Sequence, residues 1–258
     1  MNVIDTKLEP VFTRDGTFWQ PHVEAAGAFR GLHGGAVSGL LVAAMEERAR
    51  EEDWGQAMTA SVLILRPAPL EKLETKIEVL RSGGRVAMLE ATLRADGKLI
   101  AKASAAFVKP ISLPELNRVA AAPAPFDPSA LPIWGARGPQ SRTTFFDALD
   151  VRDDGNGTKW GRMKRPMVPF EAPLANVFAF ADNGTPYWLS GTEFWPPRWG
   201  FPNIDVVVHI SRPPVGRWIG VTPESDWRDN GLGLTDSKLY DERGPIGRAC
   251  QTVVLTPH

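Results

Sequence analysis

Residues 32–52 read LHGGAVSGLLVAAMEERAREE, a stretch that opens with glycines and continues with apolar residues at helical spacing. Intervals of three and four residues, which place side chains on one face of an α-helix, separate Val37, Leu40, Leu41, Ala44 and Met45. The pattern predicts an amphipathic helix that begins just after His33. Such a helix must cover its apolar face with another element, so the residues around it decide the fold.

β-type runs follow this helix in the first half of the chain, at residues 61–65, 75–81, 85–95 and 98–108. The dipeptide Asp96-Gly97 lies between the last two runs, and Asp-Gly flanked by alternating apolar residues is a strong hairpin signal. Gly83-Gly84 marks the turn before it. The first half therefore reads as a helix followed by an antiparallel meander.

The second half repeats this order, with a helix expected at residues 170–189 and strands near 205–210, 217–222, 231–240 and 246–255. The motif LILRPAPL around Arg66 resembles VHISRPPV around Arg212, which lies 146 residues later. At the same offset, KASA at residues 102–105 falls on RACQ at residues 248–251. An internal repeat of this length indicates two copies of one structural unit.

The stretch between the halves, residues 109–141, is rich in proline and small residues, which disfavour regular strand pairing. We expect an N-terminal module at residues 1–110, a linker at 111–140 and a C-terminal module at 141–258. A curved sheet wrapped around a helix is the hotdog arrangement. The predicted fold is α+β, a double hotdog of two tandem helix-plus-antiparallel-sheet modules in which the chain supplies its own pseudo-dimer.

Composition excludes several classes of function. The 29 basic and 30 acidic residues nearly cancel, so no overall field favours nucleic acid or an anionic membrane. The lone cysteine, Cys250, excludes an internal disulfide and a cysteine-based zinc cluster, and we expect it to be buried in a strand. The first residues, MNVIDTKLEP, do not read as a secretory signal, and no apolar run is long enough to span a bilayer. We expect a cytoplasmic protein.

Specific segments resemble a known family. His33-Gly34-Gly35 before an apolar helix resembles the HGG opening of single-domain hotdog thioesterases. The TesB-like double-hotdog acyl-CoA thioesterases are similar across three segments in the same order: VFAFADNGTP at 177–186, NIDVVVHISRPP at 203–214 and GLGLTDSKLYDERGPIGRACQ at 231–251. The resemblance implies a thioester hydrolase of lipid metabolism that acts on fatty acyl-CoA without a cofactor, and a homodimer of double-hotdog chains.

The resemblance also implies the site residues. The family's helix Asp falls on Asp182 and its last-strand Gln on Gln251, whereas Asn203 stands where the family usually has Thr or Ser. Thioester hydrolysis needs an activated water and donors for the developing oxyanion, but no covalent nucleophile. We expect Asp182 to act as general base or to orient the water, Gln251 to contact the same water, and Asn203 to orient the group.

The internal repeat favours the same half of the chain. At the 146-residue offset, Asn203 corresponds to Ala57 and Gln251 to Ala105. Alignment of the two helices on their openings places Asp182 opposite Val42. Because polar residues in the second half replace apolar ones in the first, we expect one site per chain, in a cleft between the modules.

Substrate contacts are expected from two further segments. Gly34 and Gly35, with His33, open a helix whose backbone N–H groups can face an oxyanion. Trp195 and Trp199, in the segment WPPRWGF, are candidates for a lid over the substrate pocket. The histidines lack the spacing of metal ligands, so metal dependence is not expected.

Other interpretations of these residues stay open. Asp182 suits a helix end, and Asn203 after Pro202 suits a turn. Gln251 lies in an alternating strand, where it can also face solvent. A hotdog hydratase or dehydratase would need a His paired with an acid, and the second half has no His near Asp182 in its motif. A non-catalytic acyl-CoA binding protein is the third reading, which the departure at Asn203 keeps open.

Overall fold

The computed structural model describes residues 8–28, 30–114, 126–135, 142–195 and 197–257. In the first half, a hairpin of β1 (Phe12–Asp15) and β2 (Phe18–Pro21) precedes α1 (Gly34–Glu51). The meander follows as β3 (Gln56–Ile64), β4 (Leu73–Ser82), β5 (Val86–Ala95) and β6 (Lys98–Val108). Positive φ angles at Asp96 and Gly97 confirm the hairpin predicted between β5 and β6.

The second half has the same plan. A hairpin of β7 (Leu149–Asp153) and β8 (Lys159–Met163) precedes α2 (Pro173–Ala181) and α3 (Gly184–Leu189). The meander is β10 (Asp205–Ile210), β11 (Ile219–Trp227), β12 (Leu232–Asp241) and β13 (Gly244–Val254). Two short strands, β9 (Trp199–Gly200) and β14 (Thr256–Pro257), pair separately. Sequence analysis missed the hairpin before each helix.

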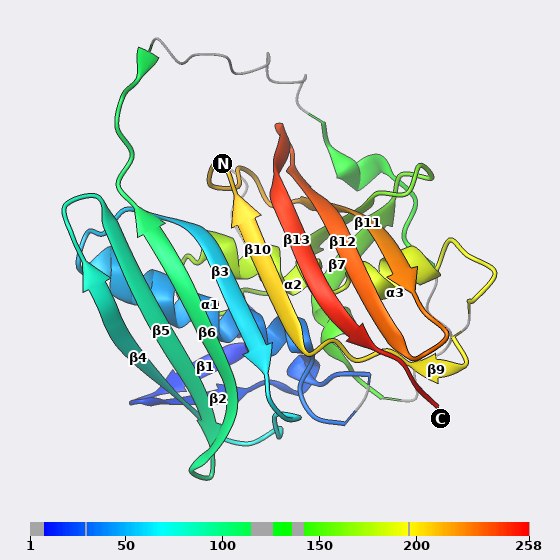
Figure 1. Ribbon diagram of the computed structural model, residues 1–258, viewed down its shortest axis with the longest axis horizontal. Helices are drawn as coiled ribbons and strands as arrows, with labels where there is room; N and C mark the ends of the chain where they lie inside the picture. The colour runs from blue at the N-terminus through cyan, green and yellow to red at the C-terminus, as the bar shows by residue number, and fades with distance from the viewer. Residues whose placement is uncertain (1–7, 29, 115–125, 136–141, 196, 258) are drawn as a thin grey trace.

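Both modules share one antiparallel sheet, in the order β1-β2-β4-β5-β6-β3-β10-β13-β12-β11-β8-β7. The order is palindromic about the β3–β10 junction, because β6 corresponds to β13 and β5 to β12. Figure 1 shows α1 and α2 on the same face of this sheet. These features confirm the predicted α+β double hotdog.

The register of the β3–β10 ladder locates the pseudo-twofold axis. Ser61 pairs with Val207, and the pairs on either side, Leu63–Asp205 and Thr59–His209, exchange under an offset of 146 residues. The bounds of β6 and β13 differ by the same 146 residues. The offset read from short sequence motifs is therefore the offset that relates the two halves in space.

Helix α1 is more buried than an amphipathic pattern predicts. Every residue from Gly35 to Met45 is buried, because the sheet covers one side of the helix and α2 packs on another. Only its last turns return to a mixed surface. A helix enclosed on several sides needs no polar face until it leaves the core, which explains the long apolar run in its sequence.

The second helix differs from its expected extent of residues 170–189. It ends at Ala181 and resumes at Gly184, so Asp182 and Asn183 form a break between α2 and α3. Pro186 explains the break, since proline has no N–H to donate to the carbonyl of residue 182 and its ring would crowd that group. The interruption leaves Asp182 at the C-cap of α2.

Two other expectations need correction or remain open. Cys250 is exposed, not buried, because alternation along β13 places its neighbour Gln251 on the inner face. Much of the expected linker at 111–140 lies outside the described residues, but Trp134 within it is buried in the core. The predicted module limits of 1–110 and 141–258 stay predictions. Among the described residues, no helix is long and apolar enough to cross a membrane.

Candidate active site

His33 forms the N-cap of α1, in extended conformation, and its Nδ1 accepts a hydrogen bond of 3.0 Å from the backbone N–H of Gly35. The imidazole ring packs against Phe145, with 4.9 Å between ring centroids, and against Phe146. These phenylalanines belong to the 3-10 helix Phe145–Ala148, which leads into β7. The second module therefore holds the first residue of the HGG motif in place.

Asp182 brings a carboxylate to the same point from the end of α2. Its side chain is nearly buried, and its Oδ2 lies 3.2 Å from Nδ1 of His33. A Cβ atom added to Gly34 would lie 2.6 Å from Oδ1 of Asp182, so only glycine allows this approach. The partial positive charge at the start of α1 favours the carboxylate in this place.

Asn203 completes the contact with Asp182. Its Nδ2 donates a hydrogen bond of 2.6 Å to Oδ1 of Asp182. An isolated bridge to Val253 of β13 fixes the Asn203 backbone just before β10 begins. A side-chain amide thus takes the place where a hydroxyl residue was expected from the family, and it still donates to the carboxylate.

Gln251 lies beside this pair and is fully enclosed, with 1% of its surface exposed. Its Nε2 donates to the carbonyl of Ala181, the residue before Asp182, and its Oε1 has no hydrogen-bond partner among the described residues. A buried unpaired acceptor costs about 1–3 kcal/mol. An acceptor of this kind suits a donor that arrives with the reaction, such as a water molecule.

Nδ1 of His33 faces both a hydrogen-bond donor, Gly35 N–H, and an acceptor, Asp182. It can bond to the first only when unprotonated and to the second only when protonated. As a lone pair it accepts from Gly35 N–H, and as an N–H it donates to Asp182. Protonation at this atom therefore exchanges one contact for the other. This pair could not be predicted from sequence, because His33 belongs to the first module and Asp182 to the second.

Sequence analysis missed a set of hydroxyl side chains under the site. Thr235 of β12 lies directly opposite Gln251 in the sheet, and its Oγ1 is 2.8 Å from Oγ1 of Thr185 and 2.7 Å from Oγ of Ser225. Thr185 belongs to α3, so this chain of hydroxyls ties the turn after Asp182 to the sheet. The 146-residue offset was a usable signal, since it pairs Thr235 with Leu89 and Ser225 with Val79.

The two tryptophans proposed as a lid make their described contacts within a surface segment. Trp199 pairs with Pro257, and its ring lies 6.4 Å from that of Phe194. The backbone N–H of Trp195 bonds to Thr192. Their described contacts stay within this surface segment and the C-terminal strand, and do not include Asp182, Asn203 or Gln251. The role of Trp195 and Trp199 as a lid stays a prediction.

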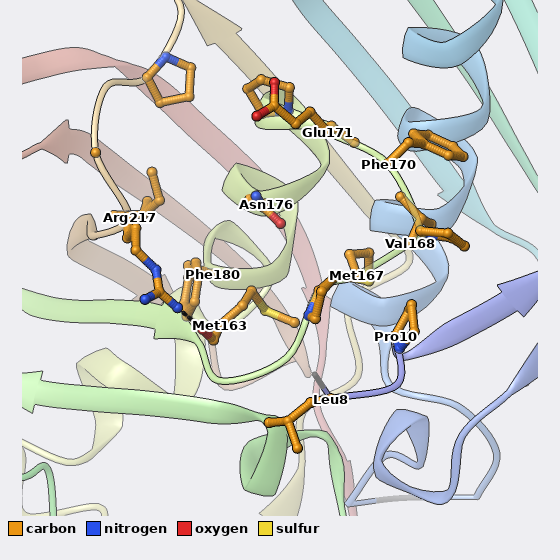
Figure 2. A pocket seen from close by; sticks show the side chains of 17 residues that line it. Leu8, Pro10, Met163, Met167, Val168, Phe170, Glu171, Asn176, Phe180 and Arg217 are labelled. Carbon is orange, nitrogen blue, oxygen red and sulfur yellow. Dashed lines mark hydrogen bonds between the residues drawn. The ribbon is translucent and has the colours of Figure 1, made fainter. Parts of the chain in front are cut away.

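A pocket of about 780 Å³ opens on another side of α2. Figure 2 shows Phe180 and Met163 beside Arg217, with Leu8 and Pro10 approaching from the N-terminal segment. Most of its lining is apolar, and it does not include Asp182. Among the described residues, no group of three His, Cys, Asp or Glu side chains is placed to hold a metal ion.

Solved structures share this fold over nearly their whole length. A putative thioesterase from Novosphingobium aromaticivorans is 20% identical, with a TM-score of 0.73, 96% of this chain covered and 100% of that chain. Acyl-CoA thioesterase II TesB2 from Mycobacterium marinum is 16% identical, with a TM-score of 0.67 and coverage of 99% and 97%. At these identities the likeness concerns the fold. No curated protein matches the sequence.

Family models match the sequence itself. The acyl-CoA thioesterase N-terminal domain matches residues 24–108, and the acyl-CoA thioesterase C-terminal domain matches residues 114–255. The two matches follow one another in the order of the two halves and together span most of the chain. The protein belongs to the acyl-CoA thioesterase family and is a thioester hydrolase.

Proposed function

We propose that the protein hydrolyses fatty acyl-CoA thioesters by Asp182-assisted attack of water. The observation that carries this proposal is the convergence at the start of α1: the Asp182 carboxylate receives the Asn203 amide at 2.6 Å and lies against Gly34. A carboxylate held in this way can accept a proton from water. The adjacent helix start offers backbone N–H groups and a partial positive charge to the oxyanion.

Each side chain has a separate task in this reaction. Asp182 takes the proton as the water oxygen bonds to the thioester carbonyl, while the unpaired Oε1 of Gln251 accepts the other water hydrogen. Asn203 keeps Oδ1 of Asp182 occupied, so that Oδ2, which also lies 3.2 Å from Nδ1 of His33, accepts the proton from water. Collapse of the tetrahedral intermediate then breaks the C–S bond and releases the free acid and the CoA thiolate, which takes up the proton held by Asp182.

The large pocket beside α2 supports a fatty acyl group as the substrate. Its walls are mostly apolar, and Phe180 in its lining lies two residues before Asp182 on the same helix. A hydrocarbon chain gains about 0.8 kcal/mol for each CH₂ that it buries. An acyl chain in this pocket would therefore lie against α2 on a different face from the one that carries the carboxylate.

CoA release from a panel of acyl-CoAs of increasing chain length, measured together with direct binding, tests the proposal. We expect turnover with a preference for chains that fill the pocket. Binding without CoA release would instead identify a non-catalytic acyl-CoA binding protein.

A hydratase or dehydratase is the second candidate because the structure removes the objection raised from sequence. That objection was the lack of a His near Asp182, and His33 lies 3.2 Å from it. A His–acid pair of this kind can abstract a proton beside a carbonyl. Incubation with a 3-hydroxyacyl-CoA distinguishes the two reactions: dehydration forms an enoyl-CoA and keeps CoA attached, whereas hydrolysis releases CoA.

A further inference from the structure

Helices α1 and α2 run antiparallel, and each carries a carboxylate to the beginning of the other. At one end, Asp182 of α2 lies against Gly34 of α1. At the other end, Glu46 of α1 accepts two backbone hydrogen bonds from the first turn of α2, at 2.9 Å from Leu174 N and 3.0 Å from Ala175 N. Glu46 therefore supplies the cap that Ala172, the N-cap residue of α2, has no side chain to provide.

Between these two ends the helices approach each other closely. A Cβ atom on Gly35 would lie 3.0 Å from the carbonyl of Ala179, and one on Gly39 would lie 3.3 Å from that of Ala175. Glycines of α1 therefore let the backbone of α2 come close there. Polar contacts at the two ends add directional hydrogen bonds to this packing.

We propose that Glu46 is a positioning residue for Asp182: by anchoring the first turn of α2, it sets where the far end of that helix places the Asp182 carboxylate against α1. This inference rests on the proposed function of Asp182. Glu46 itself makes no contact with the reacting atoms. Its effect travels through α2, a rigid element of 9 residues.

The pocket around Glu46 supports a positioning role in place of a chemical one. It has about 340 Å³ and is lined by Ala57 and Phe107, the pseudo-symmetric counterparts of Asn203 and Val253. This place corresponds to the Asp182 site in the other half, but Ala57 stands where Asn203 supplies its amide there. Both Glu46 oxygens are directed at the N–H groups of α2 instead.

Glu46 also makes the anchor sensitive to pH. Burial raises its pKa from 4.5 to about 7, against the opposing effect of the two backbone N–H groups and of Arg50. Besides Arg50 on α1, the groups facing the pocket are Asp53, Gln56 at the start of β3, and Glu171 ahead of α2. A protonated carboxyl loses acceptor capacity on one oxygen, so the hold on α2 weakens below about pH 7.

The test compares Glu46→Gln with Glu47→Gln, which removes the neighbouring carboxylate that pairs with Arg14 at the surface. At about pH 8 we expect Glu46→Gln to lower kcat about tenfold with little change in KM, since small displacements of a catalytic group cost this much or more. The variant should also lose a rise in kcat through about pH 7 that wild type and Glu47→Gln retain. Its thermal midpoint at about pH 8 should be no lower than that of wild type.

A second measurement does not depend on turnover. The side-chain amide of Asn203, which reports the position of Asp182, should show an NMR shift change through about pH 7 in wild type and Glu47→Gln but not in Glu46→Gln. Wild-type kcat and an unchanged pH step in Glu46→Gln would overturn the inference. So would an Asn203 signal insensitive to the substitution, even if no thioester were hydrolysed. Absence of CoA release from wild type would count against the proposed function alone.

Discussion

The two halves of the sheet place different chemistry at equivalent positions. In the second half, Gln251 lies opposite Thr235; in the first, Ala105 lies opposite Leu89 at the same place in the ladder. Asn203 pairs with Val253 just as Ala57 pairs with Phe107. The backbone is repeated, whereas the polar groups are not. A fold with twofold pseudo-symmetry thus offers two places for a site, and side chains equip only one of them with amides and hydroxyls.

The carboxylates show the same contrast. Asp182 keeps one oxygen beside His33 and the other on Asn203, whereas both oxygens of Glu46 receive backbone N–H groups of α2. A side chain one methylene longer reaches the neighbouring helix and caps it. The two carboxylates therefore have different roles: that of Asp182 is available for chemistry, and that of Glu46 stabilises the helix pair.

Among the predicted variants, Asp182→Asn should have the largest effect on kcat, because it removes the carboxylate of the site that holds the chemistry and keeps a side chain of the same shape. Loss of general-base assistance lowers kcat by roughly 10² to 10⁴-fold. Asn is tolerated at helix ends, so the thermal midpoint should stay close to that of wild type. Asp226→Asn, at an exposed ion pair with Arg228, is the matched control and should leave both quantities unchanged. Wild-type turnover in Asp182→Asn would remove it from the mechanism.

Glu46→Gln should change how stability depends on pH. Since the folded-state pKa of Glu46 is raised from 4.5 to about 7, wild type is most favoured below about pH 4.5 and loses stability as pH rises to about 7. A shift of this size corresponds to at most about 3 kcal/mol at higher pH. The neutral variant should escape this loss, so denaturant midpoints should diverge in its favour between about pH 5 and 8. A constant difference across that range would contradict the expectation.

Gln251→Ala makes the second half resemble the first and should lower kcat by about 10- to 100-fold, because a partner of the attacking water is lost. The reciprocal change, Ala105→Gln, should restore no activity in Asp182→Asn. It should instead cost about 1–3 kcal/mol, since it buries an amide without partners. Steady-state kinetics and denaturant unfolding measure the two results. Equal kcat in Gln251→Ala and wild type would exclude Gln251 from the site.

Thr235→Val should have the smallest effect, a loss of about 1–2 kcal/mol, because it leaves the buried hydroxyl of Thr185 without this partner. Thr222→Val is a suitable control: it removes a hydroxyl pair with Thr158 on the same sheet, in a less buried place. Thermal unfolding of both variants measures the difference. An equal loss of stability in the two variants would show that the hydroxyl chain under Gln251 contributes no more to stability than an ordinary hydroxyl pair on the sheet.

Sequence alone predicted the parts of the fold that depend on local patterns. Alternation and turn residues located β6 and β10 to the residue, and the Asp96-Gly97 hairpin has the backbone angles that its sequence favours. The repeat at 146 residues predicted the pseudo-symmetry, because equivalent strands keep their spacing along the chain. The resemblance to the family directed attention to Asp182, Asn203 and Gln251, of which Asp182 and Asn203 are in direct contact.

Tertiary structure decided what depends on contacts between the halves. His33 meets Asp182, and Glu46 caps α2, only because α1 and α2 pack side by side and antiparallel. The burial of α1 on several sides and the exposure of Cys250 likewise follow from where the sheet curves and which face it turns inward. Periodicity along a chain tells which side chains share a face. It does not tell which residue, more than a hundred positions away, that face will meet.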